Sequence, residues 1–149
     1  MAIRIATFAL LASILLALSV HATDAAYSIE GVWLSADGTG WVKIEMGADG
    51  PTGSIAGSPD DAERQRPSNK DDLNPDPALR DRDLLGLTIM QGFTAAGDGK
   101  WKNGRIYDPN SGKTYKCKLT LVDENTLELR GYIGISLLGR TETWTRREY

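Results

Sequence analysis

The stretch KTYKCKLTLVDENTLELRGYIG, Lys113–Gly134, decides the fold of this protein. Its first half alternates apolar residues with lysine and threonine, the apolar members being Tyr115, Cys117, Leu119 and Leu121. A period of two places one set of side chains on each face of a β-strand. A turn at Asp123–Asn125 then leads into a second strand over Thr126–Gly134. The stretch therefore predicts an antiparallel hairpin with one buried face.

The same pattern continues outward from this hairpin. Six further segments are predicted to be short strands: Glu30–Ser35, Gly40–Met46, Thr52–Gly57, Leu84–Phe93, Lys100–Pro109 and Arg140–Arg147. Glycine, aspartate, asparagine and proline mark the turns between most of them. The sequence thus predicts an all-β fold, an eight-stranded antiparallel up-and-down barrel with one long loop, Ser58–Asp83. A barrel of this size either packs shut or holds one small ligand.

The N-terminus predicts export. A short, positively charged start precedes the apolar run Ile5–Val20, and small residues follow. This is the pattern of a secretory signal peptide. We expect cleavage after Ala22, with Ala25 as the alternative, so that residues 1–22 are the signal peptide and residues 23–149 form a single barrel domain. The protein is then periplasmic or secreted and does not span a membrane after cleavage.

Composition excludes several classes of function. The only histidine, His21, lies in the predicted signal peptide, which removes histidine-based nucleophilic and acid–base catalysis and histidine-ligated metal sites from the mature chain. A net charge of −3 argues against binding nucleic acid. Cys117 is the only cysteine and lies on an apolar strand face, where burial is expected. We predict no enzymatic activity, no catalytic residue, no cofactor and no metal site.

Several motifs together resemble the small exported bacterial proteins grouped as domain of unknown function 2147. They are Gly31–Trp33, Asn74–Gly86, Trp101–Tyr115, Leu129–Gly134 and Thr141–Arg146. The resemblance covers nearly all of the chain after the signal peptide and implies an exported, calycin-like (lipocalin-like) antiparallel barrel. It implies no activity. Many members of that family carry further cysteines, so any disulfide of the family is absent here.

The motif Gly31–Trp33 is also similar to the Gly-x-Trp that opens the first strand of lipocalins. In those barrels, an arginine at the end of the last strand covers the tryptophan. The resemblance gives this role to Arg146 or Arg147, just after Trp144. Stacking of a guanidinium on an indole contributes about 0.5–2 kcal/mol. We expect Trp33, Trp144 and Arg146 to close the fold and to have no chemical role.

The acidic stretch DDLNPDPALRDRDLLG in the long loop can be interpreted in three ways. Its acids partly fit a calcium loop, but Pro77 stands where such loops need glycine. Alternatively, Asp76 caps a short helix that begins at Pro77, its arginines pair with Asp81 and Asp83, and the loop is a stiff lid over one mouth of the barrel. A third interpretation makes Asn74, Asp76 and Arg80 contacts to a polar ligand head or to a protein partner.

A second candidate contact region is the turn YDPNSGKTY, whose flanking Tyr107 and Tyr115 would line the rim of a ligand site. The leading hypothesis is an exported binding protein that holds a small, partly apolar or lipid-like ligand in the barrel, gated by the loop Ser58–Asp83. The alternative is a non-enzymatic module of the cell envelope that docks a protein partner through the 58–83 loop or a strand edge. A small outer-membrane barrel is disfavoured, because Lys116 and Lys118 occupy the face that lipid would need apolar.

Overall fold

The computed structural model describes residues 27–59 and 69–148. The predicted signal peptide, its cleavage point and residues 60–68 of the long loop lie outside these ranges. Within them the chain forms the strands β1 (Gly31–Leu34), β2 (Trp41–Gly47), β3 (Gly50–Gly57), β4 (Thr88–Gln91), β5 (Thr94–Gly97), β6 (Lys100–Asp108), β7 (Lys113–Asp123), β8 (Thr126–Tyr132) and β9 (Arg140–Arg146). The described ranges also contain two single turns of 3-10 helix, η1 (Pro77–Leu79) and η2 (Ser136–Leu138).

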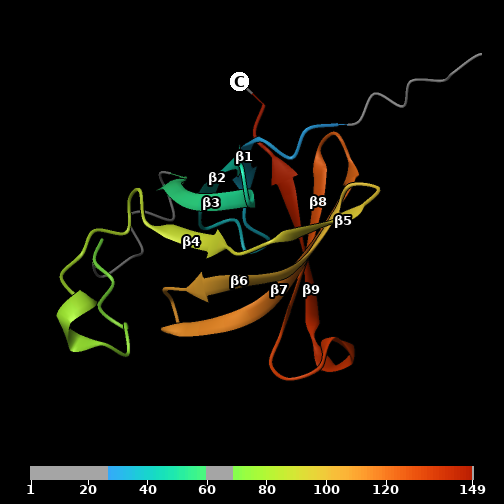
Figure 1. Cartoon of the computed structure of the whole chain (residues 1–149). Coiled ribbons are helices and arrows are strands. Elements are labelled where there is room, and N and C mark those ends of the chain that lie inside the picture. Colours follow the sequence, from blue (N-terminus) through green and yellow to red (C-terminus); the bar gives the residue numbers. More distant parts are fainter. Residues whose placement is uncertain (1–26, 60–68, 149) are drawn as a thin grey trace, which may run out of the picture.

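The strands form one antiparallel sheet that curls round into a barrel (Figure 1). Their order is β4-β3-β2-β1-β9-β8-β7-β6-β5, and a pairing between β4 and β6 closes the circle. Except for β4 and β5, strands that follow one another in the chain are neighbours in the sheet, and β1 pairs with β9 where the two ends of the chain meet. This confirms the predicted all-β, up-and-down barrel of eight strand positions.

One predicted strand is wrong in its bounds. The apolar run from Leu84 begins in the loop, and β4 starts only at Thr88. The chain then passes Gly92, whose φ is +77°, and resumes as β5 where a turn was predicted. Both pieces pair with β6, so β4 and β5 share one position of the barrel. A glycine with a positive φ inside an apolar run interrupts the strand, but both pieces keep the same neighbouring strand, β6.

The interruption between β4 and β5 places Phe93 in the core. A methyl group on Gly104, in the adjacent strand β6, would lie only 2.1 Å from the Phe93 ring. Glycine at this position is what lets the ring lie flat against β6. The largest fully buried side chains around Phe93 include Trp33, Ile29, Ile44, Met90, Leu119 and Leu127. One end of the barrel is therefore packed shut.

The alternation of β7 lies in the barrel as predicted. Cys117 and Leu119 are buried, whereas Lys116 and Lys118 are exposed on the outer face. β8 and β9 follow the same rule, with Leu127, Leu129 and Trp144 buried. The predicted burial of Cys117 is confirmed.

Candidate functional site

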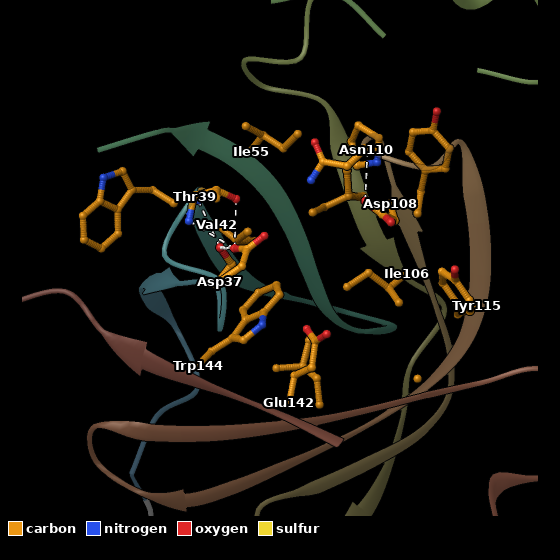
Figure 2. A pocket seen from close by; sticks show the side chains of 18 of the residues that line it. Asp37, Thr39, Val42, Ile55, Ile106, Asp108, Asn110, Tyr115, Glu142 and Trp144 are labelled. Atoms are coloured by element: carbon orange, nitrogen blue, oxygen red, sulfur yellow. Dashed lines mark hydrogen bonds between the residues drawn. The ribbon is translucent and has the colours of Figure 1, made fainter. Parts of the chain in front are cut away.

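The barrel is hollow at the end opposite this packed base. A cavity of about 480 Å³ opens there between the β1–β2 loop, the β6–β7 turn and the start of β9. This volume lies within the roughly 300–1,000 Å³ that is usual for small-molecule sites. Its deeper walls are mostly apolar, formed by Val42, Ile55, Ile89, Ile106, Cys117, Leu129 and Trp144. Figure 2 shows several of these side chains converging from different strands.

Polar side chains gather around the rim of the cavity. Asp37, in the β1–β2 loop, accepts hydrogen bonds from the Ser35 hydroxyl (2.6 Å) and from the Thr39 amide (3.1 Å) and hydroxyl (2.9 Å) (Figure 2). Burial alone would raise the pKa of Asp37, but these hydrogen bonds outweigh it and the pKa is lowered. A fixed carboxylate therefore stands on one side of the mouth.

The opposite side of the rim comes from the β6–β7 turn and from β9. Asp108 accepts from the Asn110 amide and from the Ser111 hydroxyl. Glu142 precedes Trp144 by two residues on the same inward face of β9, and its carboxylate points into the cavity (Figure 2). With Arg140 as the only basic side chain among the described lining residues, the rim is acidic.

Two residues of the deeper walls, Cys117 and Trp144, carry buried polar groups. Burial, with a smaller contribution from the Glu142 carboxylate, raises the pKa of the Cys117 thiol to about 12. The thiol is therefore protonated at neutral pH and is a poor nucleophile. The indole Nε1 of Trp144 is a buried donor with no acceptor within hydrogen-bond distance among the described residues. Trp144 is thus part of the cavity wall.

The closed base holds two of the three residues expected to seal the fold, Trp33 and Arg146, whereas Trp144 lines the cavity at the other end. The Arg146 guanidinium lies 4.2 Å from the centre of the Trp33 ring. It also donates to the carbonyl oxygens of Glu30 (2.6 Å), Ser28 (2.6 Å) and Glu124. The indole of Trp33 donates in turn to the Ile29 carbonyl at 2.9 Å. Of the two arginines considered, Arg146 covers Trp33, whereas Arg147 lies over Trp41, 4.8 Å from its ring centre.

The acidic loop is organised around Asp71, a residue that the sequence analysis did not single out. Asp71 is fully buried and accepts hydrogen bonds from the Tyr107 hydroxyl, from Asn74 (2.7 Å) and from Arg82 (2.7 and 2.8 Å). Burial alone would raise the pKa of Asp71, but the bonds from Tyr107, Asn74 and Arg82 lower it. Burial and the nearby Asp71 carboxylate raise the pKa of Tyr107 to about 12. This pairing of Arg82 differs from the one predicted with Asp81 and Asp83.

The polar groups of the loop are used mainly to hold the loop together. Asp76 caps η1 by accepting from the Ala78 amide at 2.9 Å, and Pro77 stands at the first turn, as predicted. Asn74 is buried and accepts from the Asp76 amide, while Arg80 donates to the Asn74 carbonyl at 2.8 Å. Asn74, Asp76 and Arg80 therefore lie together, but none of them is among the residues that line the cavity.

The described part of the long loop lies beside the mouth of the barrel (Figure 1). Tyr107 ties it to β6, and Leu73 packs so closely on Gly112 that a methyl group there would lie 2.0 Å from the Leu73 carbonyl oxygen. Within residues 58–59 and 69–83, only Ser58 lines the cavity. Of the sequence-predicted contacts, Tyr107 and Tyr115 line the cavity, and these residues lie on neighbouring strands.

The arrangement is suited to binding an apolar body with a polar end near the rim. Asp37, Asp108 and Glu142 are the rim carboxylates that the sequence analysis missed. Glu142 could have been found from the alternation of TETWTR, which puts it on the same face as Trp144. Among the described residues, no three His, Cys, Asp or Glu side chains gather closely enough to hold a metal ion. No helix in residues 27–59 and 69–148 is long and apolar enough to cross a bilayer.

The chain was compared with protein families, curated proteins and solved structures. A solved structure described as "Protein HP1028 from the human pathogen Helicobacter pylori belongs to the lipocalin family" is similar at 23% identity, with a TM-score of 0.73 over 82% of this chain and 84% of that one. At this identity the likeness shows the fold, which is lipocalin-like. No curated protein matches the chain. The profile of the family described as "Uncharacterized protein conserved in bacteria (DUF2147)" matches residues 31–146, and the chain belongs to this family.

Proposed function

We propose that this protein is an exported, non-enzymatic binding protein that holds a small, partly apolar ligand in the open half of its barrel. The observation that carries the proposal is the cavity of about 480 Å³, with apolar walls and a polar rim. The packed base supports it, because a ligand would enter and leave through one mouth only. The description of the family names no activity that would conflict with ligand binding.

Two further features favour binding over chemistry. The cavity thiol has its pKa raised to about 12, and the mature chain would contain no histidine. The alternative, docking through a strand edge, has less support because the barrel closes through β4 and β6. Docking through the long loop also loses support, since Asp71, Asn74 and Arg80 bond mainly within the loop.

Export is part of the proposal and rests on the N-terminal sequence. The pattern of residues 1–22 supports a periplasmic or secreted protein. Fractionation of cells that express the full coding sequence, with mass measurement of the purified protein, tests this part separately. We expect the protein in the exported fraction to have the mass of a chain that begins at Thr23. An unprocessed chain in the cytoplasm would contradict export without bearing on the cavity.

A neutral apolar dye, N-phenyl-1-naphthylamine, provides the binding test. We expect its fluorescence to rise on binding and tryptophan emission to fall, because Trp144 forms part of the cavity wall. Gly131 lies on the inward face of β8, and a methyl group there would meet only ordinary contact, 3.8 Å from Tyr115. Gly131→Leu should therefore fill the cavity and weaken dye binding at least about tenfold while the barrel still folds.

The control places the same side chain on the outer face. Thr143 is exposed on β9, so Thr143→Leu should leave dye binding unchanged. Equal dye binding by Gly131→Leu and the native protein, or no binding by the native protein, would remove the proposal.

A further inference from the structure

The outer face of the barrel carries a cluster of positive charge in a protein of net charge −3. Arg105 of β6 lies directly opposite Lys116 of β7, and Lys118 of β7 lies directly opposite Arg130 of β8. Like charges that face each other across strands destabilise a sheet. Among the ion pairs of the described residues, none involves Arg105, Lys116 or Lys118. The neighbouring acidic side chain on the outer face of β8 is Glu128, two residues before Arg130. An anionic partner would offset this repulsion.

An exposed apolar loop stands next to this cluster. The connection from β8 to β9 presents four large aliphatic side chains to solvent: Ile133 (71% exposed), Ile135 (60%), Leu137 (81%) and Leu138 (79%). All four side chains lie on one short segment and are far more exposed than the core residues. Exposed apolar groups gathered in this way mark interaction surfaces.

The loop is held in place by the basic cluster itself. Arg130 donates to the Ser136 carbonyl (2.8 Å), to the Leu137 carbonyl (3.1 Å) and to the Thr141 hydroxyl (2.8 Å). The single turn of η2 fixes the segment further, and Figure 1 shows it beside the start of β9. The leucines are therefore presented by an ordered structure.

A shallow groove joins the two features. It has a volume of about 240 Å³, and it is lined by Arg105, Thr114, Tyr115, Lys116, Tyr132, Ile133 and Gly134. Two cationic side chains and three side chains with hydroxyl groups in one groove are suited to bind a phosphate group. The aliphatic side chain of Ile133 lies at the same site. A phosphate head group with hydrocarbon directly beside it is the chemistry of a phospholipid surface.

We infer that this protein docks on an anionic lipid bilayer, with lipid phosphate in the groove between Arg105 and Lys116 and with the loop Ile133–Leu138 inserted among the acyl chains. This lipid-docking face lies outside the barrel, and Tyr115 is the lining residue that its groove shares with the cavity. Each basic residue near the surface raises the affinity for an anionic bilayer about fivefold. Apolar side chains strengthen binding further when they are buried in the head-group region. The β8–β9 connection borders the mouth, since Gly131 and Arg140 line the cavity. Docking would therefore bring the mouth close to the lipid.

Vesicle flotation tests this inference with the protein as purified from cells that express the full coding sequence. The vesicles are phosphatidylcholine alone, or phosphatidylcholine with about one-third phosphatidylglycerol. We expect binding to the anionic vesicles, little binding to the neutral ones, and a steep loss of binding as salt rises from 50 to 500 mM. All variants share the same N-terminus, so differences between them report on the docking face.

Two double variants separate the two halves of the surface. Arg105→Gln with Lys116→Gln should weaken binding about 25-fold, and Leu137→Ser with Leu138→Ser at least about tenfold. The matched controls are Lys43→Gln with Lys100→Gln, which removes the same charge elsewhere, and Leu73→Ser with Leu85→Ser, which removes exposed leucines near η1. Both controls should bind as the native protein does.

Three results would overturn the inference. They are no binding of the native protein to anionic vesicles, equal losses in the controls and in the docking-face variants, and binding that ignores lipid charge and salt. If the native protein did not bind anionic vesicles, a protein partner would replace lipid as the ligand of this face. Dye binding in the cavity is measured independently, so failure of docking and failure of the proposed function can be told apart.

Discussion

Arg146 combines stacking and hydrogen bonding at one point of the closed base. Its guanidinium covers Trp33 and donates to three carbonyl groups, two just before β1 and one in the turn between β7 and β8. A lysine at this position keeps the charge but loses the planar fork that makes these contacts together. The seal of the base therefore depends on the shape of the arginine and not on its charge alone.

We predict that Arg146→Lys lowers the free energy of unfolding by about 1–3 kcal/mol. Arg147→Lys is the matched control, because Arg147 is exposed and stacks on Trp41 beside the same strand end. Urea denaturation of both variants measures the difference. Equal stability of the two variants would contradict a sealing role for Arg146.

Asp71 provides a prediction about pH. Its pKa is lowered from the ordinary value of 3.8 in the folded protein, so its carboxylate stabilises the fold above that value. This contribution is lost as the pH falls through the lowered pKa. Asp71→Asn should therefore cost roughly 2–3 kcal/mol near neutral pH and progressively less below about pH 4.

Denaturation of Asp71→Asn and the native protein between pH 7 and pH 3 tests this dependence on pH. The neighbouring Asp72 is exposed, so Asp72→Asn should show no such trend. A stability difference for Asp71→Asn that stays constant down to pH 3 would rule out this role.

Among the elements, β6 closely approaches Phe93, the residue that lies between β4 and β5. The Phe93 ring occupies the space that a side chain at position 104 would need. We predict that Gly104→Ala lowers the free energy of unfolding by about 1–3 kcal/mol, since overpacking strains a close-packed core. Thermal denaturation followed by circular dichroism measures the effect.

Gly47→Ala is the control for this prediction, because a methyl group at Gly47 meets only an ordinary contact at 3.6 Å. The double variant Gly104→Ala with Phe93→Leu should recover part of the lost stability, since the smaller side chain leaves room for the methyl group. If Phe93→Leu gave no recovery, the loss would come from the backbone of β6.

At the scale of the whole molecule, the ladder that joins the first and last strands is short. β1 and β9 are in register at Trp33 with Arg146 and at Leu34 with Thr145, and the Arg147 amide donates to the Val32 carbonyl at 2.8 Å. β7 and β8 pair over a much longer stretch, from Lys116 with Tyr132 to Asp123 with Thr126. The β1–β9 seam should therefore open locally at a lower free energy than the β7–β8 hairpin.

Native-state hydrogen exchange measures this difference. We expect the Arg147 amide and the paired amides of β1 to exchange faster than the paired amides of β7 and β8. Arg146→Lys should speed exchange at the seam more than in β7 and β8. Uniform protection along all the strands would mean that the barrel opens only as a whole.

The sequence by itself determined the strands and their faces. Period-two alternation predicted the burial of Cys117 and Leu119, because successive side chains of a strand must point to opposite sides. Turn residues placed most of the hairpins, and the cap of Asp76 on η1 followed from local chemistry. These features depend on neighbours in the chain, so they can be inferred without coordinates.

Only the tertiary structure decided which distant groups meet. Asp71 is bound by Tyr107, 36 residues away, and neither residue carries a local signal of that contact. The cavity likewise depends on how Phe93 and its neighbours fill one end of the barrel and leave the other open. The acidic loop was expected across the mouth, yet its described part lies beside it, where its buried carboxylate is bound by Tyr107, Asn74 and Arg82. Long-range packing, which no local pattern encodes, fixed the site.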